Sequence, residues 1–111
     1  MLEVRFRRDS RDRLSSVFSS GHAGQGEYGS DIACAAVSAI LQAAWVGLSD
    51  VARVKVTGRR DSGDLQMSWP EAARDREDVR AIVATAELAI EQIAKQYDSA
   101  IRCLRESDPR E

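Results

Sequence analysis

Aromatic side chains are scarce in this chain of 111 residues, which contains Trp, Tyr and Phe only twice each. A surface that stacks the bases of single-stranded nucleic acid needs several such side chains, so the composition argues against one. An excess of positive charge is also lacking, because 16 basic and 18 acidic side chains give a formal net charge of -2. Proteins that bind nucleic acid by general attraction to phosphate carry a basic excess. We therefore expect no direct nucleic-acid binding.

Long apolar runs are lacking too, and we expect no segment to reach the roughly 20 apolar residues that span a bilayer. Residues 1–8 alternate apolar and charged side chains, unlike a signal peptide. The sequence therefore predicts a cytoplasmic protein without a membrane partner. Cysteine is rare as well, since Cys34 and Cys103 are the only two. In the cytoplasm such residues are expected to be thiols rather than a structural disulfide.

The remaining composition, with 43% apolar and 31% charged residues, is typical of a folded protein. Its length indicates one domain. We predict a single domain over residues 1–105, followed by a flexible polar tail over residues 106–111.

The first half of the chain predicts two strands and a helix. Residues 2–7 alternate apolar and charged side chains, and residues 13–20 follow a turn, so the two segments are expected to form a hairpin. A helix is expected over residues 31–46, with Gly47 as its stop. Its apolar face is expected to comprise Ile32, Ala35, Ala36, Ala39, Ile40, Ala43 and Ala44.

The second half predicts another strand pair and a second helix. Residues 51–57 and 64–69 have strand-like patterns, and a turn rich in Gly, Asp and Ser joins them. A helix is expected from Asp75, within a charged run over residues 74–80 that should be solvated. The sequence also allows a short fifth strand near residues 100–104. The order ββαββα predicts an α+β fold, in which two helices cover an antiparallel sheet of four or five strands.

The segment that suggests chemistry contains the only histidine, His22, and one of the two cysteines, Cys34. A thiol becomes a good nucleophile when it loses its proton, which a neighbouring imidazole or the positive end of a helix promotes. Cys34 would lie in the first turn of the predicted helix, and the Gly-rich loop before it could return His22 to its side. Spacing alone leaves an alternative open, in which Cys34 is a small buried residue and His22 is structural or exposed. Cys103 is expected to be a packing residue.

Residues 24–29 also match the pattern G-x-G-x-x-G between a strand and a helix, which is typical of dinucleotide-binding sites. However, the chain is short for a full nucleotide-binding sheet, and the preceding strands are expected to form a hairpin. The next predicted strand ends in Thr57 and Gly58 rather than in an acidic residue that could bind ribose. We therefore predict no cofactor, and no metal site.

The same segment resembles the signature of a known family, the ribosomal-processing cysteine protease Prp. The resemblance rests on Gly21-His22-Ala23, Tyr28-Gly29, Asp31-Ile32 and Cys34-Ala35-Ala36-Val37-Ser38, and on the gap between His22 and Cys34. Length and predicted element order agree over nearly the whole chain. Two positions depart from the pattern: Ala33 replaces a larger aliphatic residue, and Gly26 adds a glycine to the loop.

This resemblance implies a cysteine endopeptidase with Cys34 as nucleophile and His22 as general base. Members of the family remove a short N-terminal extension from a large-subunit ribosomal protein and tend to be dimers. The expected partners are therefore that N-terminal peptide and a second copy of the chain. The main alternative is a non-catalytic, ribosome-associated binding module of the same fold. Supporting or substrate-binding roles are expected for Gly21, Gly24, Gly26, Tyr28, Gly29, Asp31 and Ser38.

Two of these residues have competing roles. Asp31 would either orient His22 or, as we prefer, cap the helix. Ser38 would bond a backbone carbonyl in preference to the substrate. The loop glycines would let the loop move over a bound peptide, and N–H groups at the helix start, including that of Cys34, would hold the oxyanion.

Overall fold

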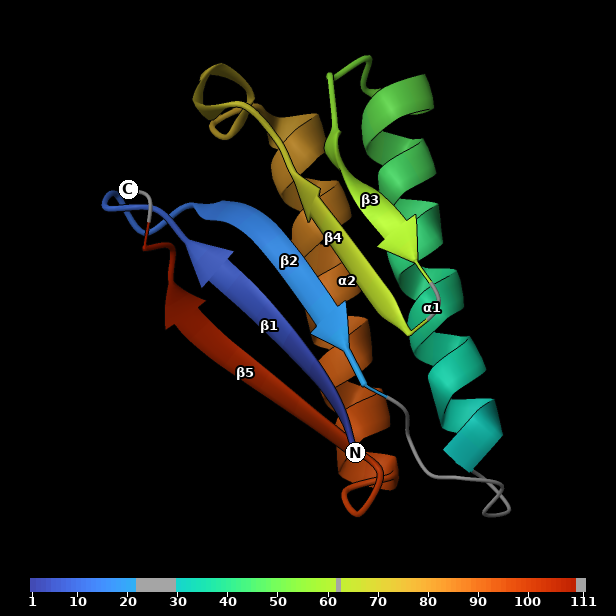
Figure 1. Cartoon of the computed structure of the whole chain (residues 1–111). Coiled ribbons are helices and arrows are strands. Elements are labelled where there is room, and N and C mark those ends of the chain that lie inside the picture. Colours follow the sequence, from blue (N-terminus) through green and yellow to red (C-terminus); the bar gives the residue numbers. More distant parts are fainter. Residues whose placement is uncertain (22–29, 62, 110–111) are drawn as a thin grey trace.

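The structure is a computed structural model that describes residues 1–21, 30–61 and 63–109, without the side chains of Ser30 and Asp31. Figure 1 shows one twisted sheet with both long helices on the same face. The elements are β1 (Leu2–Arg8), β2 (Leu14–Ser20), α1 (Ser30–Val46), a π-helical turn η1 (Gly47–Val51), β3 (Thr57–Asp61), β4 (Asp64–Ser68), a 3-10 turn η2 (Glu71–Ala73), α2 (Glu77–Gln96) and β5 (Ile101–Ser107).

The five strands lie in the order β3-β4-β2-β1-β5. The first four strands pair antiparallel, whereas β5 runs parallel to β1, with Leu2 opposite Ile101. The parallel pair arises because α2 carries the chain back to the end of the sheet at which β1 begins. The predicted α+β fold is thus confirmed, and its fifth strand is longer than the sequence suggested.

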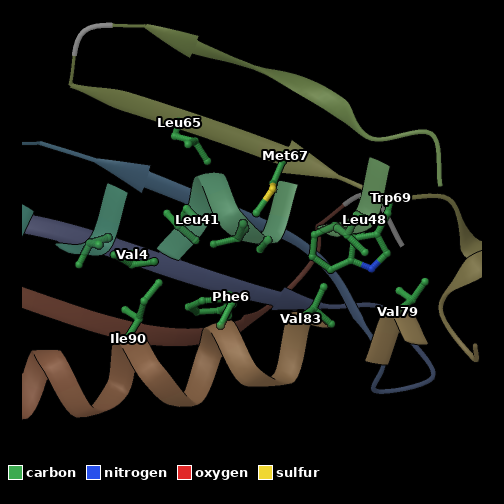
Figure 2. Packing of buried hydrophobic residues seen from close by; sticks show 14 of the residues in the cluster. Val4, Phe6, Leu41, Leu48, Leu65, Met67, Trp69, Val79, Val83 and Ile90 are labelled. Atoms are coloured by element: carbon green, nitrogen blue, oxygen red, sulfur yellow. The ribbon is translucent and has the colours of Figure 1, made fainter. Parts of the chain in front are cut away.

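The hydrophobic core lies between the sheet and the two helices. Leu2, Val4 and Phe6 alternate along β1 toward the helices and are each at most 3% exposed. Figure 2 shows Phe6 and Val4 among residues from both helices and from β4, including Leu41, Ile90 and Met67. The apolar residues that recur with a period of two in β1 and of about 3.6 in α2 therefore pack together in one layer, as the sequence pattern predicted.

The face that α1 turns to the core differs from the predicted one. The buried residues of α1 and η1 are Ala33, Val37, Leu41, Ala44 and Leu48. Of the seven predicted residues only Ala44 is buried, while four others are exposed: Ile32, Ala35, Ala39 and Ala43. Because the helix carries small apolar residues on more than one side, their spacing does not select one face. α1 consequently keeps an apolar side away from the core.

The apolar character of this helix also corrects the expectation about long apolar runs. The segment Ile32–Val51 is long and apolar enough to cross a membrane by length and composition alone. Core helices of globular proteins pass the same test, and five residues of this segment line the core described above. The segment is therefore weak evidence for a membrane span.

The third strand begins later than predicted. Residues 51–57 resemble a strand because Ala52 and Val54 alternate toward the core and are buried. However, the N–H of Val54 donates to the carbonyl of Leu48 in η1 at 2.8 Å rather than to a strand. The strand β3 starts only at Thr57. A segment whose alternate residues are buried can thus resemble a strand in the sequence although its backbone does not pair with a neighbouring strand.

The charged run at the start of α2 is not uniformly solvated. Arg74 is only 7% exposed, and its guanidinium donates to Asp9 at 2.9 Å and to the carbonyl of Trp69 at 3.0 and 3.2 Å. Arg13 donates to the same carboxylate at 3.0 Å. Burial alone would raise the pKa of Asp9, but backbone N–H groups of Arg13 and Arg11 and the Arg74 guanidinium lower it to about 2.

The predicted tail is also part of the fold over its first residues. β5 extends to Ser107, and the N–H of Asp108 donates to the carbonyl of Arg8 at 2.8 Å. The Asp108 side chain is 2% exposed and accepts hydrogen bonds from the hydroxyls of Ser15 and Ser16. The sequence predicted a tail because these residues are polar. A polar side chain can nevertheless be buried where it finds hydrogen-bond donors such as these hydroxyls.

Candidate active site

A groove opens at the end of the sheet where β1 begins and β2 ends. It has a volume of about 440 Å³, and its residues come from α1, from both of these strands and from the tip of the β3–β4 hairpin. The lining residues are Leu2, Ser19, Gly21, Cys34, Val37, Ser38, Leu41, Gln42, Arg60, Asp61, Gly63, Asp64 and Leu65. Apolar core side chains form part of this lining, and polar side chains accompany them. A concave lining that combines apolar side chains with a few polar ones is typical of a ligand-binding site.

Cys34 lies on α1, four residues after the helix begins at Ser30. Its thiol is free, half-buried and part of the groove lining. The neighbouring Ala33 and Val37 are buried and anchor this part of the helix to the core. The thiol is therefore held on a rigid element at the edge of the core, within reach of a bound molecule.

Gly21 brings the end of β2 to the same groove. Its φ of +92° lies in the region that favours glycine, and an added Cβ would lie 2.6 Å from the carbonyl oxygen of Met1. Its N–H donates to the carbonyl of Gly63 in the β3–β4 turn at 3.1 Å. Gly21 thus ties β2 to the hairpin tip through backbone contacts that a larger residue would disturb.

Polar side chains follow α1 from the thiol along the groove. The amide nitrogen of Gln42 donates to the hydroxyl of Ser38 at 2.8 Å, and Arg60 donates to the amide oxygen of Gln42 at 2.8 Å. Within the described ranges, Ser38 bonds no backbone carbonyl, although the sequence favoured such a bond. Its hydroxyl faces a side chain and the groove instead.

Among the predicted site residues, the structure brings together Gly21, Cys34 and Ser38, which all line the groove. The predictions for His22, Gly24, Gly26, Tyr28 and Gly29 concern residues outside the described ranges. Asp31 belongs to α1, but its side chain is not among the described ones, so its two competing roles stay predictions.

The second thiol lies elsewhere. Cys103 is half-buried on β5 and packs against the core, as predicted for a packing residue. Burial, followed by the carboxylates of Glu91 and Glu87, raises its pKa to about 11. A thiol with so high a pKa is a poor nucleophile at neutral pH. The described residues hold no group of three or more His, Cys, Asp or Glu side chains that could bind a metal.

Sequence reasoning missed the residues that reach the groove from other elements. Gln42 could have been found, since Cys34, Ser38 and Gln42 are spaced by four residues and share a helix face. Arg60 and Leu65 gave no local signal. The order of the strands in the sheet brings the tip of the β3–β4 hairpin to the groove beside α1, and neighbouring residues in the sequence do not reveal that order.

Comparison with known proteins identifies the family. The family model for the cysteine protease Prp matches residues 1–102. The chain belongs to this family. The resemblance drawn from the sequence is thereby confirmed over almost the whole chain. No curated protein matches the sequence significantly.

Solved structures have the same fold. The crystal structure of SMU.848 from Streptococcus mutans is 28% identical, with a TM-score of 0.85 over 97% of this chain and 96% of that one. Two structures of the essential ribosomal processing protease Prp from S. aureus are 23% identical and cover 95% of this chain and 99% of theirs. The one with a covalently linked product peptide has a TM-score of 0.78, and the one with a substrate peptide has 0.79. At this identity the S. aureus structures show a shared fold.

Proposed function

We propose that this protein is a cysteine endopeptidase that removes a short N-terminal extension from a large-subunit ribosomal protein precursor, with Cys34 as nucleophile and His22 as general base. The observation that carries the proposal is the position of Cys34 in a groove that Gly21 also lines. His22 follows Gly21 directly in the sequence. Membership of a cysteine protease family supports the same assignment.

In the proposed reaction the Cys34 thiolate attacks the scissile carbonyl, and His22, having taken the thiol proton, protonates the leaving amine. Water then hydrolyses the acyl-enzyme. Because α1 begins at Ser30, the helical pattern pairs the N–H of Cys34 with the carbonyl four residues earlier. The first N–H groups of the helix have no such partner, so they are better placed than that of Cys34 to hold the oxyanion.

The proposed substrate is the N-terminal peptide of the ribosomal protein. Leu41 and Leu65 give the groove an apolar lining that an uncharged peptide segment can cover, while Asp61 and Asp64 lie beside it on the hairpin tip. Solved structures named as the S. aureus protease contain a substrate peptide and a product peptide. These relatives support a peptide as the ligand of this groove. We place the reaction in the cytoplasm, where ribosomal proteins are assembled.

We further propose that the protein is a homodimer. The support is the outward side of α1, where Ile32 is 55% and Val46 is 52% exposed. Ala35, Ala39 and Ala43 are exposed between them on the same helix. Small residues let two helices approach closely, so Ala39→Glu should shift the sedimentation of the protein toward the monomer. A wild type that sediments as a monomer at the concentration of the cleavage assay would contradict this assignment.

Cleavage of the host precursor, or of its N-terminal peptide, by wild type and by Cys34→Ala and His22→Ala tests the function. Cys103→Ala is the matched control, because it removes the other thiol of the chain. We expect cleavage by wild type and by Cys103→Ala and none by the first two variants. If wild type binds the peptide under reducing conditions and leaves it intact, the chain is a non-catalytic, ribosome-associated binding module of the same fold.

A further inference from the structure

Three side chains along the groove, Arg60, Gln42 and Ser38, form a series of two hydrogen bonds. Arg60 Nη1 donates to Gln42 Oε1 at 2.8 Å, and Gln42 Nε2 donates to Ser38 Oγ at 2.8 Å. Arg60 comes from β3, whereas the other two residues follow Cys34 on α1 at intervals of four. The series therefore joins the edge strand to the helix that carries the thiol.

The direction of each bond is fixed by chemistry. A guanidinium has no acceptor, so the group of Gln42 that faces Arg60 must be its oxygen. The amide nitrogen consequently faces Ser38, and it can only donate. Ser38 Oγ must then accept, and its own proton must point elsewhere. Within the described part of the chain that proton has no acceptor, and Ser38 lines the groove.

We propose that Arg60 and Gln42 are positioning residues that aim the Ser38 hydroxyl proton into the groove, where it donates to a backbone carbonyl of the bound peptide. This inference rests on the peptidase function proposed above. A peptide in the groove must exchange its hydrogen bonds with water for bonds to protein, and the apolar side chains Val37 and Leu41 offer none.

Helix geometry places this bond relative to the chemistry. Four residues of an α-helix rise about 6 Å, and an extended peptide advances about 3.3 Å per residue. For a peptide that runs along α1, the separation of Cys34 and Ser38 thus corresponds to about two residues of extended substrate. Ser38 would hold the peptide about two residues from the scissile bond, so its contribution should fall on peptide binding.

Gln42→Glu tests the direction of the series. A carboxylate keeps the size of the side chain and its contact with Arg60, but it only accepts, so Ser38 must now donate to it. The Ser38 proton is then turned away from the groove. We expect a roughly fivefold to tenfold fall in kcat/KM, mainly as a raised KM, and a similar fall for Ser38→Ala, which is the range for one lost hydrogen bond.

The double variant separates this effect from the added charge. In a Ser38→Ala background, Gln42→Glu should have little further effect, whereas a direct effect of charge on the peptide would persist there. The rate at which iodoacetamide alkylates Cys34 should be the same in all variants, since this small reagent does not need the peptide contact. Additive losses in the double variant, or wild-type kinetics of Gln42→Glu, would overturn the proposal.

A second measurement distinguishes failure of this proposal from failure of the proposed peptidase function. Nuclear magnetic resonance of the Gln42 side-chain amide should show shifts of its NH₂ signals in Ser38→Ala and in Arg60→Met, because each variant removes one of its two partners. If wild type leaves the precursor peptide intact, the peptidase function fails. The proposal is then tested by titration of that peptide into the Cys34→Ala protein. Adding Gln42→Glu to this protein should weaken peptide binding roughly fivefold to tenfold. Unchanged amide signals, equal binding or no binding would overturn it.

Discussion

The two ends of the sheet are built differently. At the end with the β1–β2 turn, Asp9 and Arg74 are buried and paired, and Arg13 adds salt bridges to Glu71 and Asp75. At the other end, apolar side chains and backbone line the groove, and the polar contacts of Gln42 lie at the surface.

Together with the function proposed above, this difference assigns stability to one end and chemistry to the other. Substitutions in a buried ion pair strongly lower the free energy of unfolding, because removing one partner leaves the charge of the other without compensation. Exposed hydrogen bonds and a half-buried thiol contribute little to folding and remain accessible to a ligand. Substitutions at the two ends should therefore separate activity from stability.

The largest expected effect is at the groove. Cys34→Ala should lower the rate of precursor cleavage at least about a thousandfold, because the covalent step would lose its proposed nucleophile. The free energy of unfolding should change by less than about 1 kcal/mol, since the thiol is half-buried and small. Peptide cleavage and urea denaturation of the same preparation check both parts. A large loss of stability would mean that Cys34 is mainly a core residue.

The next effect is at the opposite end. Asp9→Asn should lower the free energy of unfolding by about 3 kcal/mol, because Arg74 and Arg13 would both lose their ion pair with this buried carboxylate. Cleavage at a temperature where the variant is folded should stay near that of wild type. The matched control is Asp12→Asn in the same turn, whose carboxylate is 92% exposed and lies 3.9 Å from Arg8. It should cost under about 0.5 kcal/mol by urea denaturation, and equal losses in both variants would contradict the comparison.

The sequence predicted these two ends unequally. Local patterns were sufficient for β1, β2, β4 and the helix around Cys34, because alternation and helical spacing depend on near neighbours, but they misplaced β3. The burial of Arg74 was missed, since its partner Asp9 is 65 residues away and a charged run resembles a solvated one. The family signature selected Gly21, Cys34 and Ser38, whereas Arg60 reaches the groove only through the sheet order.

A substitution at Gly21 should affect both activity and stability. Gly21→Ala should lower the free energy of unfolding by about 1–3 kcal/mol, because the positive φ and the carbonyl of Met1 both oppose a Cβ. It should also slow cleavage by displacing the residue next to His22. The control is Gly47→Ala, where a Cβ would meet only the side chain of Ile82 at 3.3 Å. Circular-dichroism melts and cleavage rates of the pair test this, and two indistinguishable variants would contradict it.

Strong acid should weaken the end of the sheet that holds Asp9. The pKa of Asp9 is lowered from 3.8 to about 2, so its contribution to stability is complete above pH 3.8 and is lost as the pH falls through about 2. Wild type should lose stability over this interval more steeply than Asp9→Asn. Urea denaturation at several pH values between 2 and 5 measures the two slopes. Parallel curves would show that the carboxylate titrates normally in the folded protein.

The smallest expected effect is at the second thiol, that of Cys103. The pKa of Cys103 is raised to about 11, first by burial and then by Glu91 and Glu87, so about one molecule in a thousand carries its thiolate at pH 8. In Cys34→Ala, alkylation by iodoacetamide should be slow at pH 8 and should still rise about tenfold per pH unit up to pH 9.5. An ordinary thiol would level off there, because its pKa is near 8.5. Mass spectrometry of the single remaining cysteine gives the rate, and Glu91→Gln should raise it at pH 8. Fast labelling at neutral pH would mean that β5 opens readily, and the contrast between a groove thiol and a packed thiol would fail.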